Sequence, residues 1–358
     1  MPVQAAFTLN PNEIFATVAN MIISQDVYAD NLGNHQTLVD KARVDGSMYG
    51  DKKLYYATDV LVSHAWGADA EATNLLALDR PADPKVQDIT IDVFRQIRLT
   101  IDNYLSKRAW STEGAFSSFN SVMLGWIRET KKVYDGTTYN VFIGTIETNV
   151  GEQQKTVDLG AITSDSTLNT IEKDKLEGMT IAQSLADLIV AMGDYSRDFN
   201  DYGFLRSYAN EKLKVIWNSA FVNKIRKVDL PTIFHKEGLV DKFEEDVLPA
   251  RYFGQVQATQ HTSVAGERAV HEIVINGKHY FPGDVIATGE TVPAGESYIV
   301  DAEIICKVVV KLPPYMSGFE VGTSFFNARS LTENHYLTFG HNTLEYLKNY
   351  PLVTIKAG

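Results

Sequence analysis

The chain of 358 residues contains one cysteine, Cys306, and no long hydrophobic run. One cysteine has no partner within the chain, which excludes a disulfide-stabilised scaffold. The most apolar stretch, Ile181 to Met192, is interrupted by three polar residues and is shorter than the roughly 20 apolar residues that cross a bilayer. The opening residues, MPVQAAFTLNPNEIF, lack a basic segment followed by an apolar one, so no signal peptide is expected. We therefore expect no membrane attachment, and synthesis in a reducing, cytoplasm-like compartment.

The chain is also short of positive charge. Its formal net charge is −12, from 45 acidic and 33 basic residues, so its surface repels phosphate backbones and general nucleic-acid binding is not expected. Leu205 to Lys242 departs from this average, with eight basic and four acidic residues, and an acidic run, Glu244 to Asp246, follows closely. We interpret this pattern as charge complementarity between subunits. With 44% hydrophobic and 22% charged residues the chain can bury a core, so wholesale disorder is excluded.

Three helices are expected from apolar spacing and end signals. Asn10 and Pro11 are typical of a helix start, and that helix ends near Gly33. A second helix, with Ser117 or Ser118 as its cap and Asp135-Gly136 as its stop, is indicated by apolar residues that mostly recur every three or four positions, namely Phe119, Val122, Met123, Trp126, Ile127, Val133 and Tyr134. A third covers 181–192 and ends at Gly193.

A long hairpin is expected before the second helix. From Asp88 to Asp102 apolar and polar residues alternate almost without a break, which predicts a strand far longer than the usual 5–6 residues or so. Its expected partner is Lys53–Ser63, and the two are joined by an irregular tip over 66–85. Such a half-apolar ribbon projects from a compact domain and requires another surface to cover it.

The remainder reads as mixed structure that becomes β-rich after His235. We expect a strand over 139–146, turns over 151–167, and a helix or a strand–helix junction over 213–228. Further strands are expected over 270–275, 298–300 and 304–312, separated by turns such as Asn276-Gly277 and Pro282-Gly283.

No residue pattern indicates catalysis. His271 and His279 flank the Asn276-Gly277 turn and, with Glu272, are the one arrangement that resembles a metal site; exposed hairpin histidines are the simpler interpretation. Cys306 lies in an apolar run and reads as a buried hydrophobe, and the chain has no serine-nucleophile elbow or phosphate-binding loop. We therefore expect no enzyme, and no catalytic, cofactor-binding or metal-binding residue.

The order of the expected elements carries a resemblance to a known family. An N-terminal arm, a long two-stranded excursion, a long helix, a mixed domain and C-terminal strands follow one another. Leu76 to Phe119, LALDRPADPKVQDITIDVFRQIRLTIDNYLSKRAWSTEGAFSSF, resembles the returning strand of the extended loop and the start of the spine helix in major capsid proteins of tailed phages with the Hong Kong 97 fold. Lys212 to Val240 is similar to the axial-domain region in capsid proteins of small short-tailed phages.

This resemblance implies an α+β Hong Kong 97-like fold in five parts. They are an N-terminal arm at 1–45, an extended β-hairpin loop at 46–110, a peripheral domain with the spine helix at 111–165, an axial domain at 166–330, and a C-terminal return to the peripheral domain at 331–358. Some relatives cross-link subunits through a lysine and an asparagine, but no motif places that chemistry on Lys52 or Lys53. The early helix signal at Asn10 favours a separate scaffolding protein over a cleaved one.

The implied function is that of a structural subunit. It would self-assemble into an icosahedral phage capsid that encloses double-stranded DNA without sequence-specific binding. Its partners would be many copies of itself in pentamers and hexamers, together with scaffolding and portal proteins, and it would reside in the virion after synthesis in the host cytoplasm.

Three alternatives stay open at this stage. An encapsulin-like nanocompartment shell would use the same subunit architecture. A tail or baseplate protein would account for the β-rich C-terminal third but not for the helix after a long hairpin. An enzyme would use a metal held by His271, His279 and Glu272.

Overall fold

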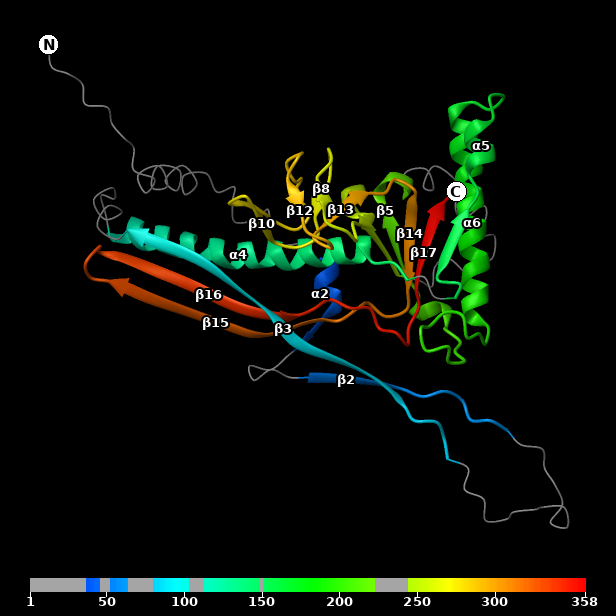
Figure 1. The fold of residues 1–358 in the computed structure, drawn as a ribbon, viewed down its shortest axis with the longest axis horizontal. Helices are drawn as coiled ribbons and strands as arrows, with labels where there is room; N and C mark the ends of the chain where they lie inside the picture. Colours follow the sequence, from blue (N-terminus) through cyan, green and yellow to red (C-terminus); the bar gives the residue numbers. More distant parts are fainter. Residues whose placement is uncertain (1–36, 46–51, 64–79, 103–112, 149–150, 223–243) are drawn as a thin grey trace. The chain divides into compact units, whose positions relative to one another are not determined.

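The computed structural model describes residues 37–45, 52–63, 80–102, 113–148, 151–222 and 244–358 (Figure 1). The helix expected from Asn10 and most of the hairpin tip lie outside these residues. The chain divides into two compact units. The first contains the described residues up to Lys52 together with Thr90–Tyr139 and Tyr315–Thr343, and the second contains Lys53–Ile89, Asn140–Pro314 and Leu344–Gly358.

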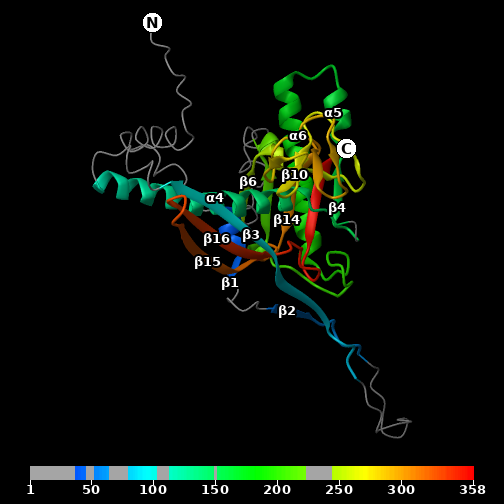
Figure 2. The same cartoon turned by 60° about the vertical axis from the view of Figure 1, so that its left-hand side comes forward.

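A sheet in the order β1-β15-β16-β3-β2 contains the long strands of the molecule (Figures 1 and 2). The strands are β1 (Arg43–Asp45), β2 (Lys52–Ala57), β3 (Lys85–Asp102), β15 (Tyr315–Asn327) and β16 (Thr332–Asn342). The predicted long strand is confirmed as β3. Its long partner, however, is β16, which pairs antiparallel with residues 91–102 of β3. The expected upstream partner is confirmed only in part, because β2 ends at Ala57 and residues 58–63 form no strand.

The alternation in β3 separates the two faces of this sheet. Towards helix α4 (Glu113–Thr145), Ile97 and Leu99 pack with Leu337 and Phe339 of β16 on side chains of the helix, among them Tyr134. The opposite face carries cross-strand polar pairs, such as Gln96 with Thr338 (3.1 Å) and Thr100 with Asn334 (2.6 Å). A sheet with one apolar and one polar face produces the period of two seen in the sequence.

Helix α4 corrects two predictions. It begins at Glu113, ahead of the expected serine caps, and it continues through Asp135-Gly136 to Thr145. The strand expected over 139–146 is therefore wrong. Tyr139, Val141 and Ile143 are buried, and so are most of their neighbours, because this end of α4 is enclosed by protein. A helix that is buried on nearly all sides has no polar stripe, so its sequence cannot be distinguished from a buried strand by periodicity.

The second unit is built on a sheet in the order β4-β17-β14-β5-β6. Its strands are β4 (Gln154–Val157), β5 (Lys214–Asn218), β6 (Glu244–Leu248), β14 (Ile304–Val309) and β17 (Leu352–Ala357). Helices α5 (Gly160–Ser164) and α6 (Thr170–Gly193) accompany it, and the expected end of the third helix at Gly193 is confirmed. α6 starts earlier than expected because Asn169 and Glu172 form a reciprocal capping box. The turn-rich segment 151–167 in fact contains β4 and α5.

Strand β14 forms the centre of this unit. All six of its residues are buried, and Cys306 lies within the hydrophobic core, as expected. Lys307 is also fully buried, and its ammonium donates a hydrogen bond to the carbonyl of Ile146, just beyond the end of α4. Burial lowers the pKa of Lys307 to about 7, against the opposing effect of the Glu147 carboxylate.

Between β6 and β14 the chain forms a group of short strands, residues 254–300, which we call the small β group. Its strands are β7 (Gly254–Val256), β8 (His261–Thr262), β9 (Arg268–Ala269), β10 (Ile273–Ile275), β11 (Lys278–Tyr280), β12 (Thr291–Val292) and β13 (Ser297–Val300). Asn276 and Gly277 both have positive φ, as the two-residue turn between β10 and β11 requires. A small core of Ala269, Ile275, Tyr280, Ile286 and Val292 holds the strands together.

The remaining short elements are helix α2 (Leu38–Ala42) and the 3-10 helices η1 (Asn210–Lys212) and η2 (Ala250–Tyr252). Among the residues that the structure describes, no helix combines the length and hydropathy that a membrane crossing requires.

Substituting alanine for two glycines of α4 should change the free energy of unfolding in opposite directions. A Cβ at Gly136 would meet no atom within 4 Å, whereas a Cβ at Gly144 would lie 2.1 Å from the Tyr252 carbonyl oxygen. Gly136→Ala should raise the free energy of unfolding by about 0.5–1 kcal/mol, since alanine is the better helix former. Gly144→Ala should lower it by about 1–3 kcal/mol through overpacking. Chemical denaturation of the two variants checks this, and equal effects would contradict the environments described for the two residues.

Candidate assembly surfaces

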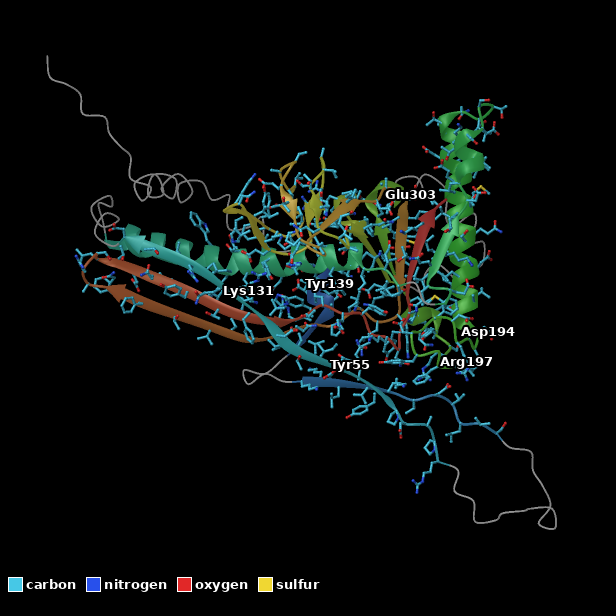
Figure 3. All side chains as sticks on the ribbon, in the orientation of Figure 1. Tyr55, Lys131, Tyr139, Asp194, Arg197 and Glu303 are labelled. Carbon is cyan, nitrogen blue, oxygen red and sulfur yellow. The ribbon has the colours of Figure 1, made fainter. Side chains whose placement is uncertain are left out.

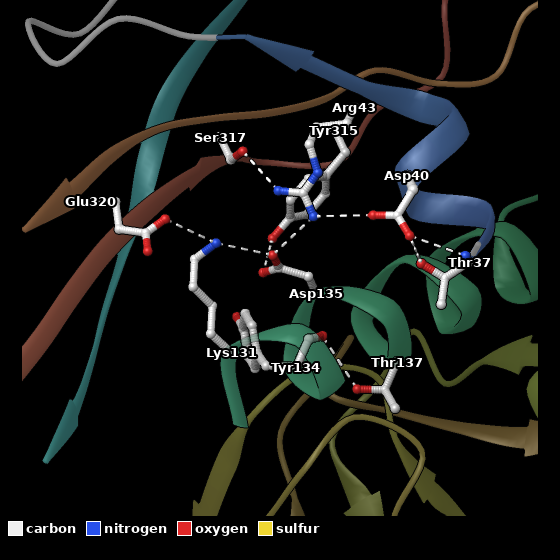
Figure 4. Close-up of polar contacts among 10 residues, drawn as sticks. All are labelled: Thr37, Asp40, Arg43, Lys131, Tyr134, Asp135, Thr137, Tyr315, Ser317 and Glu320. Atoms are coloured by element: carbon white, nitrogen blue, oxygen red, sulfur yellow. Dashed lines mark hydrogen bonds and ion pairs between the residues drawn. The ribbon is translucent and has the colours of Figure 1, made fainter. Parts of the chain in front are cut away.

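A buried carboxylate organises the first unit. Asp135 on α4 accepts a hydrogen bond from the Tyr315 hydroxyl (2.6 Å), and its other oxygen lies 3.2 Å from the Lys131 ammonium and 3.4 Å from the Arg43 guanidinium (Figure 4). The Asp135 side chain is only 2% exposed. Burial raises the pKa of Tyr315, so its hydroxyl stays protonated and donates. One carboxylate therefore joins α4 to β1 and β15.

The same cluster fixes the segment that precedes β1. Arg43 also contacts Ser317 (3.1 Å) and Asp40 (3.6 Å), and Asp40 accepts hydrogen bonds from the backbone N–H and hydroxyl of Thr37 at the start of α2. β1 runs parallel to β15, with Arg43 opposite Tyr315. Residues 37–45 are thus attached to the first unit through a charged side chain as well as through strand β1.

His341 lies beside this cluster. Burial lowers its pKa, so the ring is neutral. Its Nδ1 faces the Asn342 carbonyl (2.8 Å) and must carry the proton, which leaves Nε2 to accept from the Tyr134 hydroxyl (3.1 Å). The ring also stacks on Tyr315, with centroids 5.4 Å apart. These contacts give His341 a structural role.

In the second unit, two segments are anchored by hydrogen bonds: residues 58–63 after β2, which we call the outgoing leg, and residues 80–89, which we call the returning leg. Asp59, just after β2, accepts from the guanidinium of Arg197 (2.6 Å) and from the backbone N–H of Leu205 (3.0 Å). Arg206 donates to the Thr58 carbonyl. On the returning leg, Gln87 of β3 donates to the Tyr346 carbonyl (2.9 Å) and accepts from the Lys348 N–H (3.0 Å). Arg197 lies in the loop after α6, and Tyr55 lies on β2 (Figure 3).

Apolar side chains become exposed directly beyond the Asp59 anchor. Val60 is 53% exposed, Leu61 76% and Val62 80%, and Tyr56 on β2 is 65% exposed. Scattered exposed apolar residues are ordinary, but three in succession on a segment fixed at its base form a surface with a defined position. We call Val60–Val62 the apolar triplet. No sequence pattern distinguished it, because Lys53–Ser63 was expected to be strand throughout.

The structure separates the histidines that were considered as metal ligands. In the hairpin register His279 lies opposite Val274, and His271 lies outside β10. His271 pairs with Glu296 (2.5 Å) and His279 with Glu272 (3.3 Å), so each histidine has its own carboxylate. Within the described ranges, no three histidine, cysteine or acidic side chains gather as a metal site requires.

The expected charge complementarity between subunits stays a prediction, but one basic residue of this segment has an acidic partner within the chain. Lys214 and Glu244 form an ion pair of 2.6 Å where β5 and β6 run parallel. Most of the remaining basic segment lies outside the described residues.

The sequence matches no protein-family model and no curated protein. Solved structures that share its fold include two from phages. A chain in the capsid structure of Staphylococcus phage Andhra aligns with a TM-score of 0.60 and 10% identity, covering 90% of this chain and 84% of that chain. A chain in the structure of the head fiber and inner core protein gp22 of native bacteriophage P68 aligns with a TM-score of 0.58 and 8% identity, covering 90% of this chain and 87% of that chain.

These alignments confirm the predicted fold class, the mixed helix and sheet fold of phage capsid proteins. At identities this low the likeness concerns the fold. The narrower likeness to capsid proteins of small short-tailed phages stays a prediction, and so does the division into five parts.

Removing the charge of Asp135 should destabilise the first unit. Asp135→Asn leaves two cations beside a neutral amide, so the free energy of unfolding should fall by about 2–4 kcal/mol, as for a broken buried pair. Glu320→Gln is the matched control: Glu320 lies 3.4 Å from Lys131 but is 55% exposed, so its loss should cost less than about 1 kcal/mol. Similar losses in the two variants, measured by denaturant unfolding, would refute the central role of Asp135.

Asp59 should hold its anchor over a wide pH range. The hydrogen bond from Arg197 lowers the pKa of Asp59 to about 2, with a further contribution from the Leu205 N–H. The contribution to stability is therefore present above the ordinary aspartate pKa and is lost as the pH falls towards about 2. Asp59→Ala should make amide hydrogen exchange at Val60 and Leu205 severalfold faster at neutral pH. Asp83→Ala, on the other leg, should leave both rates unchanged; if it speeds them equally, the anchor is not Asp59.

Proposed function

We propose that the chain is the structural subunit of a tailed-phage capsid, which self-assembles into an icosahedral shell around double-stranded DNA. The observation that carries this proposal is the fold shared over nine-tenths of the chain with a chain of a phage capsid structure. The proposed role is structural, not catalytic.

The surface chemistry of the subunit supports assembly. A shell subunit must leave surfaces that only its neighbours cover. The apolar triplet is such a surface, because its residues are exposed although the backbone at their base is fixed by Asp59 and Arg206. In the proposed division the triplet belongs to the extended loop, 46–110, which would lie on a neighbouring subunit. The attached segment up to Asp45 would be the end of the N-terminal arm.

The net charge supports a container for DNA. A surface with a net charge of −12 repels packaged nucleic acid, so the DNA would fill the shell without being bound by sequence. Scaffolding and portal proteins are the further partners that this role would require, with assembly in the host cytoplasm and final residence in the virion. The encapsulin-like shell and the tail or baseplate subunit are the alternatives, and genes for a portal, a terminase and a scaffold beside this gene would separate the phage capsid from the encapsulin.

The first test is negative-stain electron microscopy of the purified protein, alone and coexpressed with its genomic neighbours. Closed shells, sheets or rings tens of nanometres across are the expected result. A monodisperse monomer under both conditions would contradict the proposal.

A substitution in the apolar triplet tests the surface itself. Leu61→Asp should leave the subunit folded, because Leu61 is exposed, but should abolish closed shells by placing a charge in an apolar contact. Leu61→Met, which keeps the apolar volume, should still assemble. Unfolding midpoints equal to wild type show that both variants are folded, and intact shells from Leu61→Asp would exclude the triplet as a contact.

A further inference from the structure

The small β group contains a hydrogen-bonded chain that requires a proton. Nδ1 of His261 lies 2.9 Å from the Thr259 carbonyl oxygen, and Nε2 lies 2.5 Å from a carboxylate oxygen of Glu267. Both ring nitrogens thus face acceptors, whereas a neutral imidazole has a single N–H. The arrangement is complete only when the His261–Glu267 pair holds one additional proton, as an imidazolium beside a carboxylate.

Glu267 is the buried member of this pair. Its side chain has no exposed surface, while that of His261 is 23% exposed. The Ser297 hydroxyl donates to the same carboxylate oxygen as His261, and the Val264 N–H donates to the other one (2.9 Å). The carboxylate lies between serine and histidine, unlike the order of a hydrolytic triad, in which the histidine is central. The network is therefore a structural link and not a nucleophile.

The network joins several elements of the small β group. His261 lies on β8, Ser297 begins β13, and the Glu267 carbonyl accepts from the Ile286 N–H (2.8 Å). Among the strands that the structure describes, β8 pairs only with β12, through His261–Val292 and Thr262–Thr291. A two-residue strand at the edge contributes few backbone hydrogen bonds, so its side-chain link matters more to its attachment.

We propose that His261 and Glu267 form a proton-dependent lock, which holds β8 against the small β group at neutral and acidic pH and releases it as the pH rises. When the imidazolium loses its proton, one nitrogen lone pair faces either the Thr259 carbonyl or the Glu267 carboxylate. In either case the buried carboxylate loses its cation and keeps only neutral donors, and one acceptor of the network is left facing a lone pair, which penalises the closed arrangement.

Among the groups that face His261 from the neighbouring strands, Glu267 is its charged partner. The residues that β12 places opposite β8 are Val292 and Thr291, and β13 contributes Ser297. Glu290, which precedes β12, accepts from the Asn276 amide, and Arg268 donates to the Gly283 carbonyl. The pKa directions agree with the geometry: the Thr259 carbonyl and the Glu267 carboxylate raise the pKa of His261. Burial raises the pKa of Glu267, but its three donors outweigh burial and lower it.

The sign of the effect follows from the raised histidine pKa. The stabilisation is fully present below the ordinary histidine pKa of ~6.5 and is lost as the pH rises through the higher value in the folded chain. Between these two pKa values, closing takes up one proton and opening releases it, so the opening constant of β8 should rise by up to about tenfold per pH unit.

Hydrogen exchange of the full-length protein tests the lock. Protection factors for the amides of 261–267 and 286–292, corrected for intrinsic exchange, are measured from about pH 6 to about pH 9, on either side of the expected transition. In wild type they should fall with rising pH. In His261→Gln, whose amide donates to Glu267 without titrating, they should be independent of pH. His279→Gln is the matched control, since His279 is paired with Glu272 outside the network, and should behave as wild type.

Two results would overturn the lock: protection that does not change with pH in wild type, or the same dependence in His261→Gln. If His261→Gln does not fold, the titration of the histidine rings in wild type by NMR decides the matter. A His261 midpoint above ~6.5 supports the lock, and a midpoint at or below it refutes it. None of these measurements requires shell assembly, so their outcome is separate from that of the proposed capsid function.

Discussion

The first unit depends on the burial of one charge. Asp135 lies inside α4, next to a glycine, at a position where the sequence signals the end of a helix. The helix continues because the carboxylate receives Tyr315, Lys131 and Arg43, and these partners come from α4, β15 and β1. A buried carboxylate without partners would cost several kcal/mol, so the three partners and the strands that carry them must assemble together. The register of β1 on β15 and the attachment of the segment from Thr37 onward follow from this requirement.

The sequence predicted elements where local signals and tertiary environment agreed. β3 alternates because one face of its sheet packs on α4 and the other is polar, and α6 ends at Gly193 where its apolar spacing ends. Prediction from the sequence failed where the tertiary environment outweighed the local helix or strand signal. Asp135-Gly136 is a stop signal only if the carboxylate is solvated. Tyr139 to Ile143 read like a buried strand because this part of α4 is enclosed on nearly all sides. The pairing of β3 with β16, about 240 residues apart along the chain, had no local signal at all. The apolar triplet could not be foreseen either, since residues 58–63 form no strand although their sequence resembles one.

The outgoing and returning legs are held by different kinds of hydrogen bond. The outgoing leg is fixed by charge, through Asp59, Arg197 and Arg206, whereas the returning leg is fixed by a neutral amide, Gln87, on backbone groups. Screening by salt weakens an exposed ion pair much more than a neutral hydrogen bond. The direction in which the outgoing leg leaves the unit is thus sensitive to ionic conditions, while the position of the returning leg is not.

Cys306 on the central strand β14 can be used to measure how often the core of the second unit opens. Cys306 has no exposed surface, and burial raises the pKa of its thiol, so the reactive thiolate does not form while the sheet is closed. Because it is the only cysteine in the sequence, the rate at which a thiol reagent modifies the unaltered protein measures how often the core of the second unit opens. A cysteine introduced at an exposed position can, for the same reason, be labelled selectively in the folded chain.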